Sequence, residues 1–128
     1  MTSLETNSDA QSRIHSDAHQ LAQALISAAS SGDPREALRA LRAERQHVLQ
    51  ENHGDKEVTR AMMKEIRREA NQEATQYERS NHLPIVVFHA RSTEDGRKVA
   101  GIGRQNNQQA WEEWNPRSKS WEPVNQNR

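Results

Sequence analysis

The chain contains 128 residues, of which 18 are basic and 18 acidic, and it has no cysteine. This length predicts one domain with a single core. Without cysteine the chain has no disulfides, thiolate nucleophiles or cysteine-bound metal centres, and its formal net charge of zero gives no overall attraction to nucleic acid or acidic membranes.

The hydrophobic core is expected to be small. Leu, Ile, Val and Phe together number 19 residues, whereas alanine, which buries little area, numbers 15. Small chains with small cores often gain stability from association. We therefore expect a homo-oligomer or a protein partner.

The first 11 residues are polar and are predicted to form a flexible tail before a single domain over residues 12–128. The start of the chain lacks the basic and apolar regions of a secretory signal, and no stretch is apolar enough to span a membrane. We therefore expect a cytoplasmic protein without a membrane partner.

Residues 12–81 are predicted to form the helical part of the domain. In the first helix, apolar residues recur every three or four positions, as on one face of an amphipathic helix. These residues are Ile14, Ala18, Leu21, Leu25 and Ala28. The run Ser30-Ser31-Gly32 is typical of a helix C-terminus, so we expect the helix to end there.

A second helix is predicted to begin directly after this stop. Asp33 is a good N-cap, and Pro34 is tolerated at the first helical position, where its missing N–H is not needed. The run Asn52-His53-Gly54 should end this helix. Because the connection is so short, we expect the first two helices to form an antiparallel hairpin.

Asp55 is predicted to cap a third helix that runs to about Asn81. The second half of this helix is polar apart from Ala70, Ala74 and Tyr77. This half is either a solvated rod or a narrow alanine seam that meets another chain. In the second case Ala70, Ala74 and Tyr77 are partner-binding residues.

Residues 83–125 are predicted to form an antiparallel β-meander of three to four strands. Residues 85–88 are a continuous apolar run, which is typical of a strand covered on both faces. The pair Asp95-Gly96 predicts a two-residue turn into a strand over residues 98–102, and residues 104–107 predict the next turn. Helices followed by strands indicate the α+β fold class.

The last hairpin holds all three tryptophans. With a loop over residues 116–119, strand pairing places Trp114 opposite Trp121 and Trp111 opposite Val124. Because successive residues of a strand point to opposite faces, the two pairs lie on different faces of the sheet. We expect Trp114 and Trp121 to fasten the sheet to the helices, and Trp111 with Val124 to contact a partner.

Basic residues recur along the second and third helices and again in the sheet region. Several cations on one face can bind a phosphate backbone. Acidic residues are interleaved with them, however, as on an ordinary solvated helix. The candidate nucleic-acid-binding residues are Arg35, Arg39, Arg42, Lys64, Arg67, Arg68, Arg104, Arg117 and Lys119.

We find no arrangement of residues typical of catalysis. His15 and His19 are one helical turn apart and could share a divalent ion, but no third ligand can be assigned, so no metal site is expected. Gly101 and Gly103 lack the third glycine and the following helix of a dinucleotide loop, and instead indicate a bulge or a close backbone approach. We therefore expect neither an enzyme nor a cofactor.

These observations favour a non-enzymatic protein–protein interaction or adaptor module, self-associating through its helices in one version. The alternative is a small nucleic-acid-binding accessory or regulatory protein. It would use the arginine ridges of the second and third helices, or a sheet on which cations lie beside exposed aromatic rings.

Overall fold

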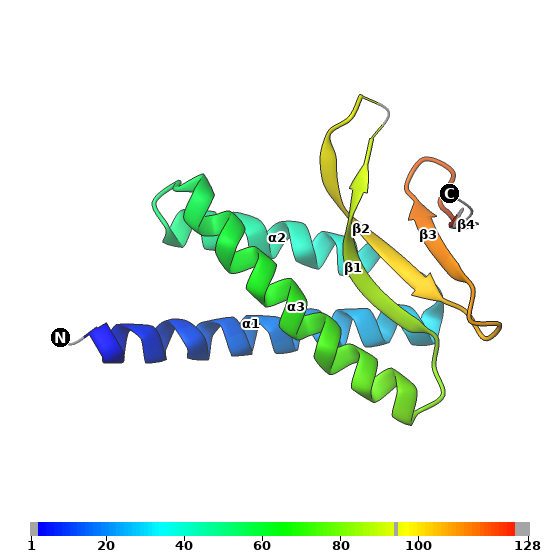
Figure 1. The fold of residues 1–128 in the computed structure, drawn as a ribbon, viewed down its shortest axis with the longest axis horizontal. Helices are drawn as coiled ribbons and strands as arrows, with labels where there is room; N and C mark the ends of the chain where they lie inside the picture. The colour runs from blue at the N-terminus through cyan, green and yellow to red at the C-terminus, as the bar shows by residue number, and fades with distance from the viewer. Residues whose placement is uncertain (1–2, 94, 125–128) are drawn as a thin grey trace.

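The computed structural model describes residues 3–93 and 95–124, with side chains from residue 11 onward. Three helices precede four strands, which confirms the α+β class (Figure 1). The elements are α1 (Ser3–Ser31), α2 (Arg35–Glu51), α3 (Lys56–Ser80), β1 (Ile85–Ser92), β2 (Lys98–Gln105), β3 (Trp111–Asn115) and β4 (Ser120–Pro123).

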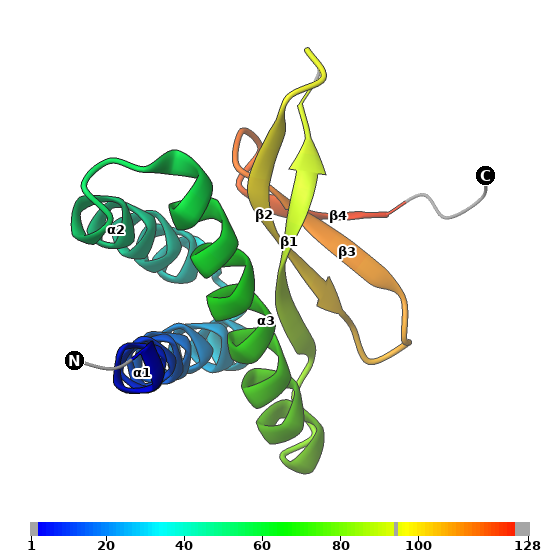
Figure 2. The same ribbon diagram turned by 60° about the vertical axis from the view of Figure 1, so that its left-hand side comes forward.

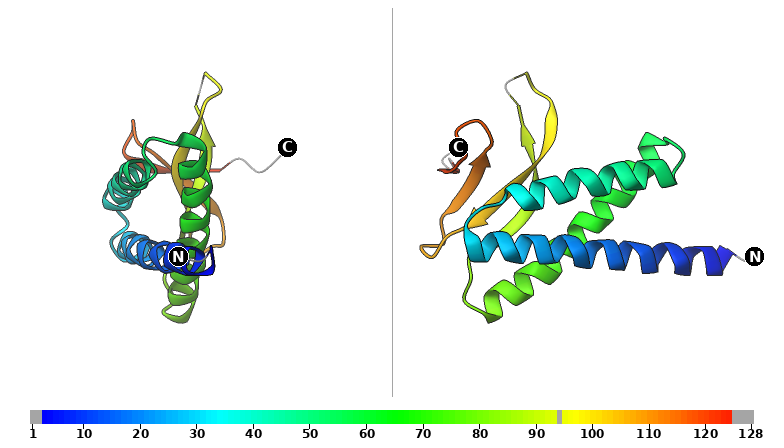
Figure 3. Two further views of the ribbon diagram at one scale, coloured as in Figure 1. Left: turned by 90° about the vertical axis from the view of Figure 1, so that its left-hand side faces the viewer. Right: turned by 180° about the vertical axis from the view of Figure 1, so that it is seen from behind.

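α1 begins well before the predicted first helix. It includes residues 3–11, which were expected to form a flexible tail, and its first turns extend past the loop between α2 and α3 (Figure 3). Residues 3–11 contain neither Pro nor Gly, and extending an existing helix is far easier than nucleating a new one. Residues 1–2 of the predicted tail and residue 125 of the predicted meander lie outside the described residues.

The predicted start of α3 is confirmed by its hydrogen bonds, and that of α2 is displaced by one residue. α2 begins one residue later than predicted, with Pro34 rather than Asp33 at the N-cap position, although Asp33 Oδ1 still accepts the backbone N–H of Arg35, the first helical residue, at 3.0 Å. At the start of α3, Asp55 Oδ1 accepts two backbone N–H groups. α1 and α2 lie side by side and antiparallel, as expected for a helical hairpin (Figure 1).

Two residues beyond the end of α2, and again beyond the end of α3, lies a histidine in the left-handed conformation. His53 has a φ of 55° and His82 a φ of 57°. Beyond His82, the Leu83 N–H donates to the Glu78 carbonyl at 2.8 Å, which is the Schellman arrangement. This turn directs the chain back along α3 into β1.

The four strands form one antiparallel sheet in the order β1-β2-β3-β4. The register between β3 and β4 pairs Trp114 with Trp121 and Asn115 with Ser120, as predicted. The first two loops differ in detail from the prediction. The β1–β2 loop closes with the Thr93 N–H bonded to the Arg97 carbonyl, so it is longer than two residues.

The second turn is also displaced from its predicted place. β2 continues to Gln105, and Asn106 rather than Arg104 begins the turn. Asn106 Oδ1 accepts the N–H groups of Gln108 and Ala110. This side chain therefore closes the turn, while Arg104 stays in the sheet.

The helices cover only one face of the sheet (Figure 2). Val86 and Phe88 point to that face and are buried together with Leu25, Ile66 and other apolar residues of the helices. The residues that alternate with them on β1 are only partly buried. The prediction that β1 is covered on both faces is therefore wrong, because no described residue forms a second layer.

Side chains of α3 form hydrogen bonds with backbone groups on the edge of β1 that faces away from β2. Asn71 accepts from the Phe88 N–H at 2.8 Å and donates to the Phe88 carbonyl at 3.0 Å. Glu78 Oε1 accepts from the Val86 N–H at 3.2 Å. An exposed strand edge can pair with another chain, and these contacts prevent such pairing at Val86 and Phe88.

Glu78 is a fully buried acid at this edge. Its side chain has no exposed surface, and its Oε2 has no hydrogen-bond partner. Burial raises the pKa of Glu78 to about 8, although the hydrogen bond from Val86 acts in the opposite direction. The uncharged carboxyl form is therefore the one that suits the folded chain at neutral pH.

Candidate functional site

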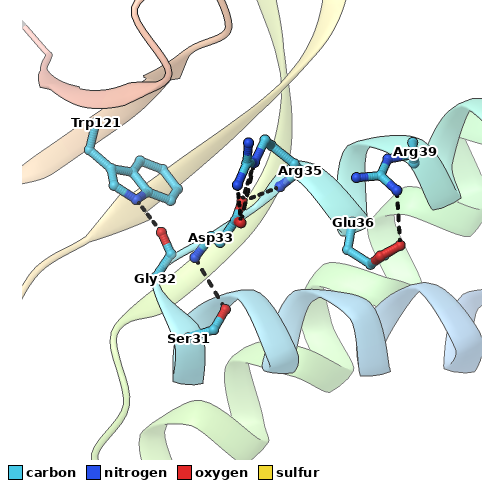
Figure 4. A network of polar contacts seen from close by, with 7 residues as sticks. All are labelled: Ser31, Gly32, Asp33, Arg35, Glu36, Arg39 and Trp121. Carbon is cyan, nitrogen blue, oxygen red and sulfur yellow. Dashed lines mark hydrogen bonds and ion pairs between the residues drawn. The ribbon is translucent and has the colours of Figure 1, made fainter.

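The tryptophan hairpin is fastened to the helices by two of its three rings. Trp114 and Trp121 meet edge to face with centroids 5.5 Å apart. The Trp121 indole N–H donates to the Gly32 carbonyl at 2.9 Å, at the junction of α1 and α2 (Figure 4). Trp114 is buried. The predicted role of this pair as the link between sheet and helices is confirmed.

Arg104 belongs to the same anchor. Its guanidinium lies 4.3 Å from the centre of the Trp121 ring, and its Nη2 is 2.8 Å from Glu112 Oε1. Such a stacked and paired arginine stabilises the junction between β2, β3 and β4. Arg104 was predicted to be an exposed cation that contacts nucleic acid, but its guanidinium is engaged by Trp121 and Glu112.

We define the open face as the side of the sheet that points away from the helices. Ile85, Gln105 and Trp111 are neighbours in register across β1, β2 and β3, and the Val124 N–H donates to the Trp111 carbonyl at 3.0 Å. Trp111 is half-buried among these neighbours, and Val124 is 40% exposed. The predicted pair of Trp111 and Val124 therefore lies together on the open face.

Two glycines shape the middle of the open face. A Cβ at Gly103 would lie 3.2 Å from the His89 ring, and one at Gly101 would lie 3.2 Å from Arg91 Cβ. The β1–β2 register is continuous, so there is no bulge here. Glu113 Oε1 lies 3.6 Å from Arg91 Nε and 3.9 Å from His89 Nε2. The glycines thus let His89 and Arg91 lie flat against β2.

The sequence reasoning missed this polar cluster. Its signal is the Gly-x-Gly spacing on β2, which places both glycines on one face of the strand. Only the register shows that His89 and Arg91 face them, because residues of β1 and β2 that are distant in sequence become neighbours.

Two of the predicted partner-binding residues on α3 are not available to a partner. Ala70 and Ala74 are fully buried within the chain, whereas Tyr77 is 49% exposed. The alanine seam packs inside the protein because α1 crosses this part of α3, as the contact between His15 and Glu69 shows. The predicted alanine seam therefore does not mediate self-association, because Ala70 and Ala74 pack within a single chain.

His15 and His19 form two parallel contacts with α3. His15 Nδ1 lies 2.7 Å from Glu69 Oε2, and His19 Nδ1 lies 2.6 Å from Glu73 Oε2. Among the described residues, no group of three or more His, Asp and Glu side chains is arranged to hold a metal ion. The pair thus connects α1 to α3, and the matching i, i+4 spacing of Glu69 and Glu73 is the signal that sequence reasoning overlooked.

A hollow of about 480 Å³ between α1 and α2 holds a carboxyl pair. Burial, followed by a hydrogen bond with Asp17, raises the pKa of Glu44 to about 8. His47, which also lines the hollow, lies 3.6 Å from Glu51 through its Nε2. The protonated form of Glu44 is therefore favoured at neutral pH, because burial and the neighbouring carboxylate both disfavour its negative charge.

The nine candidate nucleic-acid-binding residues fall into separate groups. Four of them line one hollow beside the tryptophan hairpin, and these are Arg35, Arg39, Arg42 and Lys119. Arg117 lies in the same loop as Lys119. Three more candidates lie on α3, and none of them lines the hollow. Lys64 is exposed and Arg68 pairs with Glu65, whereas Arg67 is partly buried, which lowers its pKa.

Comparison with known proteins gives no relative for this chain, since no family model, curated protein or solved structure matches it. Within residues 3–93 and 95–124, no helix is long and apolar enough to cross a membrane.

Proposed function

We propose that the chain is a non-enzymatic binding module that docks a protein partner on the open face of its sheet. The observation that best supports this is the position of Trp111, the one tryptophan that does not belong to the anchor. It lies with Ile85, Val87 and Val124 on a face that no described element covers (Figure 2). Tryptophan is among the residues that contribute most to protein–protein binding.

The open face combines an apolar end with a polar end. Ile85 and Trp111 lie at the apolar end, while His89, Arg91 and Glu113 lie at the polar end. Protein interfaces commonly surround a small apolar centre with polar groups. Because Glu113 holds the cation of Arg91 in place, little side-chain freedom remains to be lost when a partner binds.

Because Ala70 and Ala74 are buried, a second copy of the chain cannot bind at this seam, and we propose that it would use the open face. Size-exclusion chromatography with light scattering distinguishes the two versions of the proposal. A wild-type oligomer that becomes monomeric in Trp111→Ala supports self-association. If the wild type is a monomer, self-association is excluded and the proposed partner is a different protein.

The test of the partner version is a direct binding measurement. A protein captured by the wild-type chain is purified, and its affinity is measured by calorimetry for the wild type, Trp111→Ala and Val124→Lys. We expect the affinity to fall by at least about tenfold in both variants, as is typical for a central aromatic contact.

Ala100→Lys is the matched control, because Ala100 is exposed on β2 but alternates to the helix side of the sheet. We expect this variant to bind as the wild type does. The proposal fails if Trp111→Ala and Val124→Lys both keep full affinity, or if the control loses as much as they do.

A further inference from the structure

A hollow of about 200 Å³ lies between the N-terminal half of α2 and the loop that joins β3 to β4. It is lined by Arg35, Leu38, Arg39 and Arg42 from α2, and by Trp114, Pro116 and Lys119 from the hairpin. Four of these seven residues are cationic and none is acidic. We propose that this basic hollow binds phosphate groups of a nucleic-acid strand.

α2 supplies three of the four cations from one face. Arg35, Arg39 and Arg42 are separated by four and then three positions, so they follow one another along the helix surface. At 1.5 Å per residue they cover roughly 10 Å, which is enough to contact more than one phosphate of a strand. α2 also begins at Arg35, so the positive end of the helix dipole adds to this potential.

Hydrogen bonds of the hairpin loop hold the backbone of the fourth cationic residue in place. Lys119 has a φ of 55°, and its N–H donates to the Asn115 carbonyl at 2.8 Å. Asn115 Oδ1 also accepts the N–H of Arg117 at 2.9 Å. The contact of Trp121 with the α1–α2 junction keeps this loop beside α2. The loop is thus ordered before a ligand binds, which lowers the entropic cost of binding.

The charges of the hollow are only partly neutralised. Arg35 pairs with Asp33 at 2.8 Å, and the hydrogen bond from Arg35 lowers the pKa of Asp33 to about 2. Arg39 lies 3.4 Å from Glu36, a pair that is exposed on both sides and therefore weak (Figure 4).

Arg42 and Lys119 are the cations best placed to meet a ligand. Neither makes an ion pair with any other described residue. An anion entering the hollow would therefore meet two charges with no competing carboxylate. Arginine guanidinium groups also match phosphate oxygens in geometry.

The size of the hollow indicates a group on a larger ligand. Pockets that enclose a whole small molecule measure roughly 300–1,000 Å³, whereas this one is smaller and open. Trp114, the only aromatic ring in the lining, is 8% exposed, so it offers no face on which a base could stack. Phosphate contacts without base contacts carry no sequence information, and we expect binding without sequence preference.

The test is fluorescence anisotropy with a labelled single-stranded DNA of random sequence, at salt concentrations from about 50 to 200 mM. The variant combines Arg39→Gln, Arg42→Gln and Lys119→Gln, whose side chains are all exposed. We expect the slope of log affinity against log salt to become less negative by about 2, since each phosphate contact on a single strand contributes about 0.7. Arg35 is left unchanged because its backbone and side chain both bond to Asp33 at the start of α2.

The control removes the same charge from other exposed positions, with Lys56→Gln, Arg60→Gln and Arg79→Gln on α3. We expect it to keep the wild-type slope. Absence of binding at low salt, or an equal loss in the control, overturns the proposal. The proposal is also overturned if poly-glutamate binds as tightly as the DNA, because the site would then accept any polyanion. It is likewise overturned if inorganic phosphate binds as tightly at an equal concentration of phosphate, because the site would then be one for the free ion.

Discussion

Replacing Glu78 with glutamine should make the protein more stable, and increasingly so as the pH rises. Glu78 is fully buried, and burial raises its pKa to about 8, whereas the ordinary value is 4.5. Between these two values the unfolded chain carries an ionised carboxylate while the folded chain keeps a proton. Rising pH therefore favours unfolding throughout this interval.

The size of the effect follows from the length of that interval. Each pH unit corresponds to about 1.4 kcal/mol, so the wild type loses on the order of 3 kcal/mol of unfolding free energy between pH 4.5 and pH 7 through this group. Glutamine keeps an oxygen for the Val86 N–H but cannot ionise. Its NH₂ takes the place of an oxygen that has no partner in the wild type.

Urea denaturation followed by circular dichroism, at several values between about pH 5 and pH 8, measures this difference. We expect Glu78→Gln to gain stability relative to the wild type with each step in pH. Glu57→Gln, an exposed change in the first turn of the same helix, is the control and should lower stability by only tenths of a kcal/mol. A difference between Glu78→Gln and wild type that does not change with pH refutes the reasoning.

Three further changes test the local structure by the same denaturation assay. Trp121→Phe keeps an aromatic ring but removes the N–H that bonds to the α1–α2 junction, and should cost about 1 kcal/mol; an unchanged midpoint would contradict the anchor. Gly103→Ala should cost about 1–3 kcal/mol because its Cβ meets the His89 ring. The cost should be smaller when Gly103→Ala is made together with His89→Ala, and an equal cost in that background would contradict the contact. His53→Gly relieves the left-handed conformation and should stabilise by about 0.5–1 kcal/mol; a loss of stability would show that the side chain of His53 has another role.

Features set by local sequence could be predicted. The cap at Asp55 and the pairing of Trp114 with Trp121 depend on neighbouring residues or on one short turn. Alternation along β3 was then enough to place Trp111 on the opposite face. These predictions needed no knowledge of how the helices cross.

Features that depend on the crossing of α3 could not be predicted. The narrow seam of Ala70 and Ala74 looks the same whether it meets α1 or another chain. Likewise, a polar pattern does not show that Asn71 and Glu78 reach the edge of β1. Such contacts are set by the angle between packed elements, which sequence periodicity does not specify.

The basic hollow illustrates the same limit. The arginines of α2 and the lysine of the hairpin were both candidates, but they lie more than seventy positions apart in the sequence. The contact of Trp121 with Gly32 brings them together. The arginines of α2, which resemble an ordinary solvated helix face in the sequence, therefore line one side of a hollow whose other side is the hairpin.

The two faces of the tryptophan hairpin can be tested together by ¹⁹F NMR on protein labelled with 5-fluorotryptophan, with resonances assigned by single Trp→Phe substitutions. Titration with single-stranded DNA should shift the resonance of Trp114, which lines the basic hollow, and leave that of Trp111 unchanged on the open face. A shift confined to Trp111, or no shift at saturating DNA, would contradict the assignment of phosphate binding to the helix side of the hairpin.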